Sequence, residues 1–144
     1  MSFARHFTLD ELTVSQTAAR RGLSNSPDSN SEDWLGELAT QLLDPIRDAV
    51  GRAVLVSSGY RAPAVNRAVG GAASSQHVLG QAADFRVNGM TPSELVALIR
   101  TLGLPFDQLI EEPTWVHISI GPRNRRQVLR ARRTHTGMKY EALP

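Results

Sequence analysis

The sequence has 144 residues, of which 41% are hydrophobic and 21% charged, a composition typical of one globular domain with its own core. It contains no cysteine, which excludes disulfides and thiolate metal sites, so any bound metal has to be held by His, Asp or Glu. The net charge is only +2, but 15 of the 16 basic residues are Arg, and six of them lie between Arg123 and Arg133.

Two further absences bear on where the protein is expected to act. No stretch approaches the roughly 18 consecutive apolar residues that indicate a membrane-spanning helix. The opening segment, MSFARHFTLDEL, has no signal peptide character, because it lacks a basic segment followed by an apolar run. We therefore expect a protein without membrane contact that is cytoplasmic on synthesis and reaches any substrate outside the membrane by release or delivery.

The first third of the chain is predicted to be helical. A short helix is expected from Thr8, which precedes two acidic residues, to about Arg21. After a polar loop, Ser31 is expected to cap a second helix, in which apolar residues recur at helical spacing as far as Val50. Pro45 lies inside that pattern and is expected to kink the helix.

Strands dominate the rest of the sequence. They are predicted at residues 53–57, 81–87, 107–111 and 115–120, the last two joined as a tight hairpin, with an edge strand at 125–132. Pro63 opens a short helix between the first two strands, and Thr91 with Glu94 forms a capping box for another. Helices followed by strands favour an α+β fold, with a small antiparallel β-sheet and helices packed mainly on one face. We expect a single domain over residues 1–144, with a loosely ordered tail from about residue 134.

The predicted strands at 81–87 and 115–120 share an alternation that points to chemistry. In each strand every second residue is apolar, and Asp84 and His117 lie on the faces opposite these apolar residues. If the strands are neighbours, the two side chains converge, and Gly80 allows the loop that carries His77 to turn back toward them. Two imidazoles and one carboxylate leave a tetrahedral position open for water, as in catalytic zinc sites. The spacing alone also fits a structural His and a turn-forming Asp.

Two motifs, in this order, resemble the zinc D-Ala-D-Ala carboxypeptidase family, which includes phage endolysin peptidases and the vancomycin-resistance D,D-dipeptidases. The motifs, Ser-x-His-x6-Asp and Trp-x-His, lie at Ser75, His77, Asp84, Trp115 and His117. The first belongs to a longer similar stretch, SSGYRAPAVNRAVGGAASSQHVLGQAADFRV. The segments FTLDEL and LLDPIRDAV also look like the short, phage-associated branch, so the resemblance extends over most of the chain.

The resemblance implies a fold like that of hedgehog and the D-Ala-D-Ala peptidases, with one zinc ion held by His77, Asp84 and His117. In such enzymes zinc activates water, and a nearby carboxylate takes and returns the proton. In several relatives this carboxylate lies three residues before the last His, a position held here by Thr114, which cannot act as a base. Glu112 is the first candidate for the base and Glu111 the second, and both also fit a solvated hairpin tip.

The same resemblance implies residues that bind substrate. Arg61, in the segment SGYRAP, is similar to an arginine of the family that binds substrate, and a guanidinium can hold a carboxylate or stabilise charge on the attacked carbonyl. Ser75 and Gln76 are expected to bind substrate or to orient the first metal ligand. Tyr60 and Trp115 are expected either to line the pocket or to pack in the core.

These features predict a zinc-dependent peptidase that hydrolyses D-amino-acid-containing bonds in peptidoglycan stem peptides, as a D-Ala-D-Ala carboxypeptidase or a cross-link endopeptidase, with a phage or prophage origin plausible. A non-catalytic, zinc-containing cell-wall-binding module is an alternative, which the Thr114 departure supports. A basic nucleic-acid-binding protein is a third hypothesis. The Arg123–Arg133 run fits weak contact with anionic polymers or the charged face of an edge strand. A monomer is the default expectation.

Overall fold

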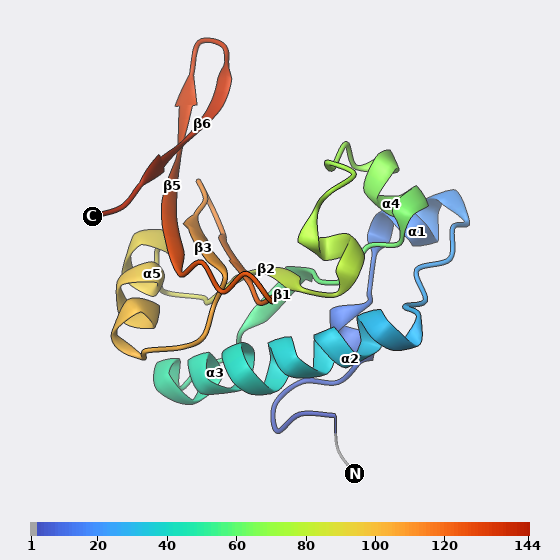
Figure 1. The fold of residues 1–144 in the computed structure, drawn as a ribbon, viewed down its shortest axis with the longest axis horizontal. Helices are drawn as coiled ribbons and strands as arrows, with labels where there is room; N and C mark the ends of the chain where they lie inside the picture. The colour runs from blue at the N-terminus through green and yellow to red at the C-terminus, as the bar shows by residue number, and fades with distance from the viewer. Residues whose placement is uncertain (1–2) are drawn as a thin grey trace.

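The computed structural model describes residues 3–144 and is built around one six-stranded sheet (Figure 1). Its strands are β1 (Leu55–Ser58), β2 (Ala82–Arg86), β3 (Gln108–Glu111), β4 (Val116–Ser119), β5 (Gln127–Thr134) and β6 (Gly137–Ala142). They lie in the order β1-β2-β4-β3-β5-β6, and every neighbouring pair is antiparallel except β3 and β5. The predicted α+β class and the β3–β4 hairpin are confirmed. The sheet is mixed, because β5 runs parallel to β3.

Eight helical segments lie outside the sheet in the described part of the chain. They are η1 (Asp10–Leu12), α1 (Gln16–Arg21), α2 (Ser29–Leu38), η2 (Ala39–Leu43), α3 (Asp44–Val50), α4 (Pro63–Ala68), η3 (Gln76–Leu79) and α5 (Pro92–Thr101). The helix predicted from Thr8 is interrupted, because Ser15 is extended and its side chain caps α1 by accepting a hydrogen bond from the Ala18 N–H. Within residues 3–144, no helix combines the length and the apolar character needed to cross a membrane.

The longest helical unit consists of α2, η2 and α3, which follow one another without a break from Ser29 to Val50. It begins earlier than predicted, because the Asp28 side chain accepts a hydrogen bond from the Ser31 N–H and takes the capping role expected of Ser31. The middle segment, η2, is a π-helical turn that lies directly before the start of α3 and Pro45. Proline has no N–H to donate, so the change of helical hydrogen bonding at this point accommodates it without ending the helix.

The core lies between one face of the sheet and the helices α2, α3 and α5 (Figure 1). The sheet contributes Ala83, Phe85, Leu109, Val116 and Ile118, and the helices contribute Leu35, Leu38, Leu42, Ile46, Leu95 and Ile99. All of these side chains are buried, and burying each of the larger ones stabilises the fold by about 1.5–3 kcal/mol. The alternation predicted for the second and fourth strands is therefore confirmed, and the opposite face of these strands is left for polar groups.

The C-terminal residues form an ordered hairpin of β5 and β6, which Figure 1 shows rising away from the rest of the molecule. This corrects the expectation of a loosely ordered tail from about residue 134 and of β5 as an edge strand, because β6 pairs with β5 on its outer side. The end of the hairpin is tied to the body. The Leu143 N–H donates to the Val128 carbonyl, Leu143 packs against the core, and the Arg100 side chain donates to the Pro144 carbonyl.

Candidate metal centre

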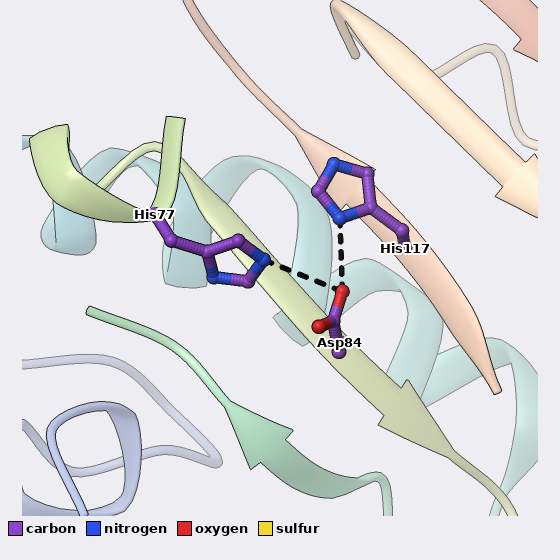
Figure 2. A group of neighbouring side chains, drawn as sticks. All are labelled: His77, Asp84 and His117. Carbon is purple, nitrogen blue, oxygen red and sulfur yellow. Dashed lines mark hydrogen bonds and ion pairs between the residues drawn. The ribbon is translucent and has the colours of Figure 1, made fainter. Parts of the chain in front are cut away.

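Three side chains, His77, Asp84 and His117, converge on the sheet face opposite the core (Figure 2). We call these three residues the metal group. Asp84 on β2 and His117 on β4 are direct partners in the antiparallel register, and His77 lies in η3, just before β2. Their potential ligand atoms all lie within 4.8 Å of one another, and no other group of this kind occurs among residues 3–144. Asp84 Oδ1 is 2.9 Å from His117 Nδ1 and 3.4 Å from His77 Nε2. β2 and β4 are therefore neighbours in the sheet, which was the condition for Asp84 and His117 to converge.

The loop that carries His77 is held by a cap and by one glycine. Ser75 Oγ accepts a hydrogen bond from the His77 N–H at 3.2 Å and thereby caps η3. Gly80 ends η3 with a φ of 76°, in the left-handed region, and a Cβ at this position would collide with the Ser31 carbonyl on α2. Position 80 therefore requires glycine for its backbone conformation and for its close approach to α2. The turn it makes leads directly into the strand that carries Asp84.

The donor set fits a zinc ion. His77 is buried, and its Nδ1 donates to the Gly59 carbonyl at 2.7 Å, so in the neutral ring the lone pair lies on Nε2, the nitrogen nearest Asp84. Histidines that bind metals commonly donate their other ring N–H to a backbone carbonyl in this way. On His117 the nitrogen nearest Asp84 is Nδ1. Two imidazoles and one carboxylate are the ligand types of catalytic zinc, and they leave one of four positions for another ligand.

Asp84 is held in its ionised form. Burial acts to raise the pKa of Asp84, but hydrogen bonds from His117 and His77, together with the charges on these rings, outweigh it and hold the pKa well below its ordinary range. A carboxylate is the form of Asp that binds a cation. Asp84 therefore offers the site a negatively charged oxygen ligand.

Sheet alternation turns Glu111 away from this group. In the β3–β4 pair Glu111 lies opposite Val116, whose side chain is in the core, so both side chains point to the face without the metal group. The Glu111 carboxylate forms an ion pair with Arg130, with Oε2 2.7 Å from Nε. Thr114 is exposed between β3 and β4 and does not border the cleft around His77, Asp84 and His117.

The metal group borders a cleft with a volume of about 770 Å³. Glu112 lies on the same face of the sheet and borders this cleft as well. Its side chain is 9% exposed. Burial raises the pKa of Glu112 and repulsion from Asp84 adds to the shift, whereas His117 and a hydrogen bond from Tyr140 oppose it without cancelling it. A raised carboxyl pKa suits a group that accepts and returns a proton near neutral pH. Of the two candidate bases, only Glu112 is brought to the metal group.

Arg61 borders the cleft beside the metal group. The backbone N–H of Arg61 donates to the His77 carbonyl at 3.0 Å, and the side-chain Nη1 donates to Asn66 Oδ1 at 3.1 Å. Asn66 is itself buried and donates to the Ala72 carbonyl, which holds the guanidinium in place. Among residues 3–144, Arg61 Nε is the one buried side-chain nitrogen or oxygen without a hydrogen-bond partner. A buried donor without an acceptor is costly, and this donor lies in a residue that borders the cleft.

The other residues expected at the substrate site occupy different surroundings. Trp115 and Ser75 border the cleft, although the Ser75 hydroxyl is engaged in capping η3. Tyr60 is buried in the core and borders a second groove, of about 530 Å³, which reaches Asp84 from the side of α1 and α4. The Gln76 side-chain amide donates to Gln81 Oε1 at 3.3 Å and to the buried carboxylate of Asp107, so its N–H groups are directed into the protein.

Asp107 is a fully buried carboxylate beside the cleft, and sequence reasoning missed it. Arg125 binds both of its oxygens, with Nε 2.9 Å from Oδ1 and Nη2 2.8 Å from Oδ2, and the Arg125 N–H donates to Oδ1 as well. Hydrogen bonding to Arg125 lowers the pKa of Asp107 to about 2. Gln76, which precedes His77, donates to Oδ2 at 3.1 Å and so connects the pair to η3. The available signal was an acidic residue inside the apolar segment LPFDQLI.

The arginine run is divided between ion pairs and the cleft. Arg130 pairs with Glu111 on β3, and Arg132 pairs with Glu141 on β6, with Nη2 2.8 Å from Oε1. Arg123 and Arg125 border the cleft that contains the metal group. Arg130 and Arg132 are therefore paired with acids of the sheet, whereas Arg123 and Arg125 form ion pairs with the buried Asp107. Contact of this run with anionic polymers stays a prediction.

Comparison with known proteins assigns a family. A family model described as Peptidase M15 matches residues 5–119, a range that contains all three members of the metal group as well as Arg61 and Glu112. No curated protein matches the chain. The matched range ends at the close of β4 and does not include the β5–β6 hairpin.

Proposed function

The chain belongs to the peptidase M15 family of zinc metallopeptidases, and from this premise we propose that it hydrolyses D-amino-acid-containing peptide bonds of bacterial peptidoglycan. The observation that carries the proposal is the arrangement of one cleft. Its wall holds the group His77, Asp84 and His117, a buried carboxylate at Glu112, and a guanidinium at Arg61. A peptidase of this type needs a metal site, a proton carrier and a cation for the substrate, and all three are adjacent here.

In the proposed reaction His77, Asp84 and His117 would hold one zinc ion. Zinc in such a site acts as a Lewis acid that polarises a carbonyl and makes water acidic enough to attack at neutral pH. Glu112 takes the proton of the attacking water on a carboxylate oxygen and delivers it to the nitrogen of the leaving amine. Its burial favours both steps, because the raised pKa makes the protonated form accessible.

Arg61 binds the substrate in this proposal. Arg61 borders the cleft, and its Nη1 is held by Asn66, so the guanidinium has a fixed position there. An acceptor on the substrate, either a terminal carboxylate or the carbonyl oxygen under attack, binds to the guanidinium. Trp115, which borders the same cleft, provides an apolar wall for the peptide.

The finer assignment is a D-Ala-D-Ala carboxypeptidase or a cross-link endopeptidase, and the proposal includes both. The resemblance to the short, phage-associated branch supports a phage or prophage origin and delivery to the wall during lysis or from a virion. We propose a monomer whose partners are the stem peptides, with weak contact between the Arg123–Arg133 run and anionic wall polymers.

The test is digestion of purified peptidoglycan and of synthetic peptides that end in D-Ala-D-Ala. Zinc-loaded protein is expected to release new amino groups or free D-Ala, and chelation is expected to stop the release. Peptides that end in L-Ala-L-Ala are the matched control and are expected to stay intact. Binding to peptidoglycan without cleavage, by protein with full zinc content and across several wall types, would instead establish the non-catalytic wall-binding module.

A further inference from the structure

Tyr140 is brought to the site by the β5–β6 hairpin, which lies outside the matched residues 5–119. It borders the cleft together with Asp84 and His117. Its hydroxyl lies 3.3 Å from both oxygens of the Glu112 carboxylate. Two equal distances, each longer than the roughly 2.7 Å of a single O–H···O bond, describe a hydroxyl shared between both oxygens. Such a contact restrains rotation of the carboxylate.

The sheet register explains how Tyr140 reaches Glu112 from two strands away. Glu111 on β3 pairs with Arg130 on β5, and the next position along this parallel pair places Glu112 beside Ala131. Ala131 in turn pairs with Tyr140 on β6. All three side chains therefore lie on one face. Neighbouring strands are about 4.8 Å apart, so a Tyr ring and a Glu side chain together span the distance across β5. The span is open because the residue between them is alanine.

We propose that Tyr140 is a positioning residue, which holds the Glu112 carboxylate at the metal group through its hydroxyl. The inference rests on the proposed function, in which Glu112 carries the proton. A carboxylate has about four lone-pair sites, so the Tyr140 hydroxyl orients Glu112 and leaves lone pairs free for the water proton. The hairpin is anchored at its base by Leu143 and Val128, so the tyrosine is held by the sheet and not by a free tail.

The first test is a kinetic double-mutant cycle on the zinc-loaded protein. Tyr140→Phe is expected to lower kcat by about three- to thirty-fold, because a hydrogen bond to a charged group is lost from a half-exposed position, with KM unchanged. In a Glu112→Gln background the same substitution is expected to have no further effect, since the two residues act as one unit. A wild-type kcat in Tyr140→Phe, a change in KM alone, or independent losses in the double variant would overturn the inference.

Two more variants separate positioning from general damage to the hairpin. Ala131→Leu places a bulky side chain between Tyr140 and Glu112 and is expected to lower kcat as Tyr140→Phe does. Met138→Ala changes an exposed side chain of the same strand, farther from the cleft, and is expected to keep the wild-type kcat. Equal losses in Met138→Ala and Tyr140→Phe would contradict a specific role for the hydroxyl.

A further readout does not depend on turnover. The chain has two tyrosines, so an ultraviolet titration of Tyr140→Phe identifies the ionisation of Tyr140 by difference. Burial and the nearby Glu112 carboxylate raise the pKa of Tyr140. Glu112→Gln removes that negative charge, and the Tyr140 transition is expected to move to lower pH. An unchanged transition would overturn the contact itself, whereas an inactive wild type with a shifted transition would overturn only the proposed function.

Discussion

Asp84 and His117 are cross-strand partners in the β2–β4 pair, and their side chains meet at 2.9 Å on the sheet face opposite the core. Because both residues lie in regular antiparallel strands, backbone hydrogen bonding sets the distance between them. Only His77 is placed by a loop, and that loop is constrained by Ser75 and Gly80. Two of the three side chains that could hold a metal are thus placed by paired strands, which suits a preorganised site.

Removal of any member of the metal group is expected to abolish stable zinc binding. His77→Ala, Asp84→Ala and His117→Ala should each weaken zinc by more than the roughly 10–100-fold that loss of an outer partner costs. Zinc content after purification, and competition with a chromogenic chelator, measure the effect. His135→Ala is the matched control, because this histidine is exposed in the turn between β5 and β6 and should leave zinc binding unchanged. Full zinc content in Asp84→Ala and His117→Ala would refute the site.

The two adjacent glutamates are expected to differ sharply in activity. Glu112→Gln should lower kcat by about 10²–10⁴-fold with zinc retained, because the proton carrier is lost. Glu111→Gln should stay within a few-fold of wild type, since it removes only an ion pair with Arg130 whose contribution to stability is about 0–1 kcal/mol. Turnover of wall peptides and zinc content are measured side by side. Comparable losses in both variants would contradict the assignment that sheet alternation supports.

Arg61 is expected to act through its geometry as well as its charge. Arg61→Lys keeps the charge but loses the planar guanidinium that Asn66 holds in place, so KM should rise by about ten-fold or more, the equivalent of one hydrogen bond to a charged group. Asn66→Ala should raise KM by less, because it only releases the guanidinium. Arg67→Lys, on the exposed side of α4, is the control. Wild-type KM in Arg61→Lys would show that charge alone is sufficient.

Asp107 is expected to dominate the electrostatic stability of the fold. Asp107→Asn leaves Arg125 without its partner and should lower the free energy of unfolding by an amount toward the lower end of about 3–5 kcal/mol, because Arg125 is one-third exposed. Chemical denaturation measures the change. Glu141→Gln breaks the exposed pair with Arg132 and should cost at most about 1 kcal/mol. Similar values for both variants would indicate that burial of Asp107 is unimportant.

The same carboxylate predicts a pH dependence of stability. Folding lowers the pKa of Asp107 from 3.8 to about 2, so the folded state binds this proton less readily than the unfolded state. Its contribution is fully present above about pH 4 and is lost as the pH falls toward 2. The stability difference between wild type and Asp107→Asn should therefore shrink over that window. A difference that stays constant from pH 5 to pH 2 would argue against an ionised Asp107 in the folded protein.

Local features were predictable where all the determinants lie within a few residues. The capping box of Thr91 and Glu94 is present, because both partners belong to one helical turn. Competition between neighbours was less predictable, since Asp28 took the capping role expected of Ser31. The hairpin strand β6 was missed altogether, because its stability comes from pairing with β5 and not from a pattern of its own.

The sequence by itself determined the kinds of ligand, because His77, Asp84 and His117 are the motif residues and strand alternation set two of them on a polar face. It left Glu111 and Glu112 as alternatives, and it gave no indication of the partners of Asp107 or Tyr140. Tertiary structure decided these points. Which face a residue adopts, and which charge lies beside it, depend on register between strands that are distant in the chain, and backbone hydrogen bonds and core burial fix that register only in the folded protein.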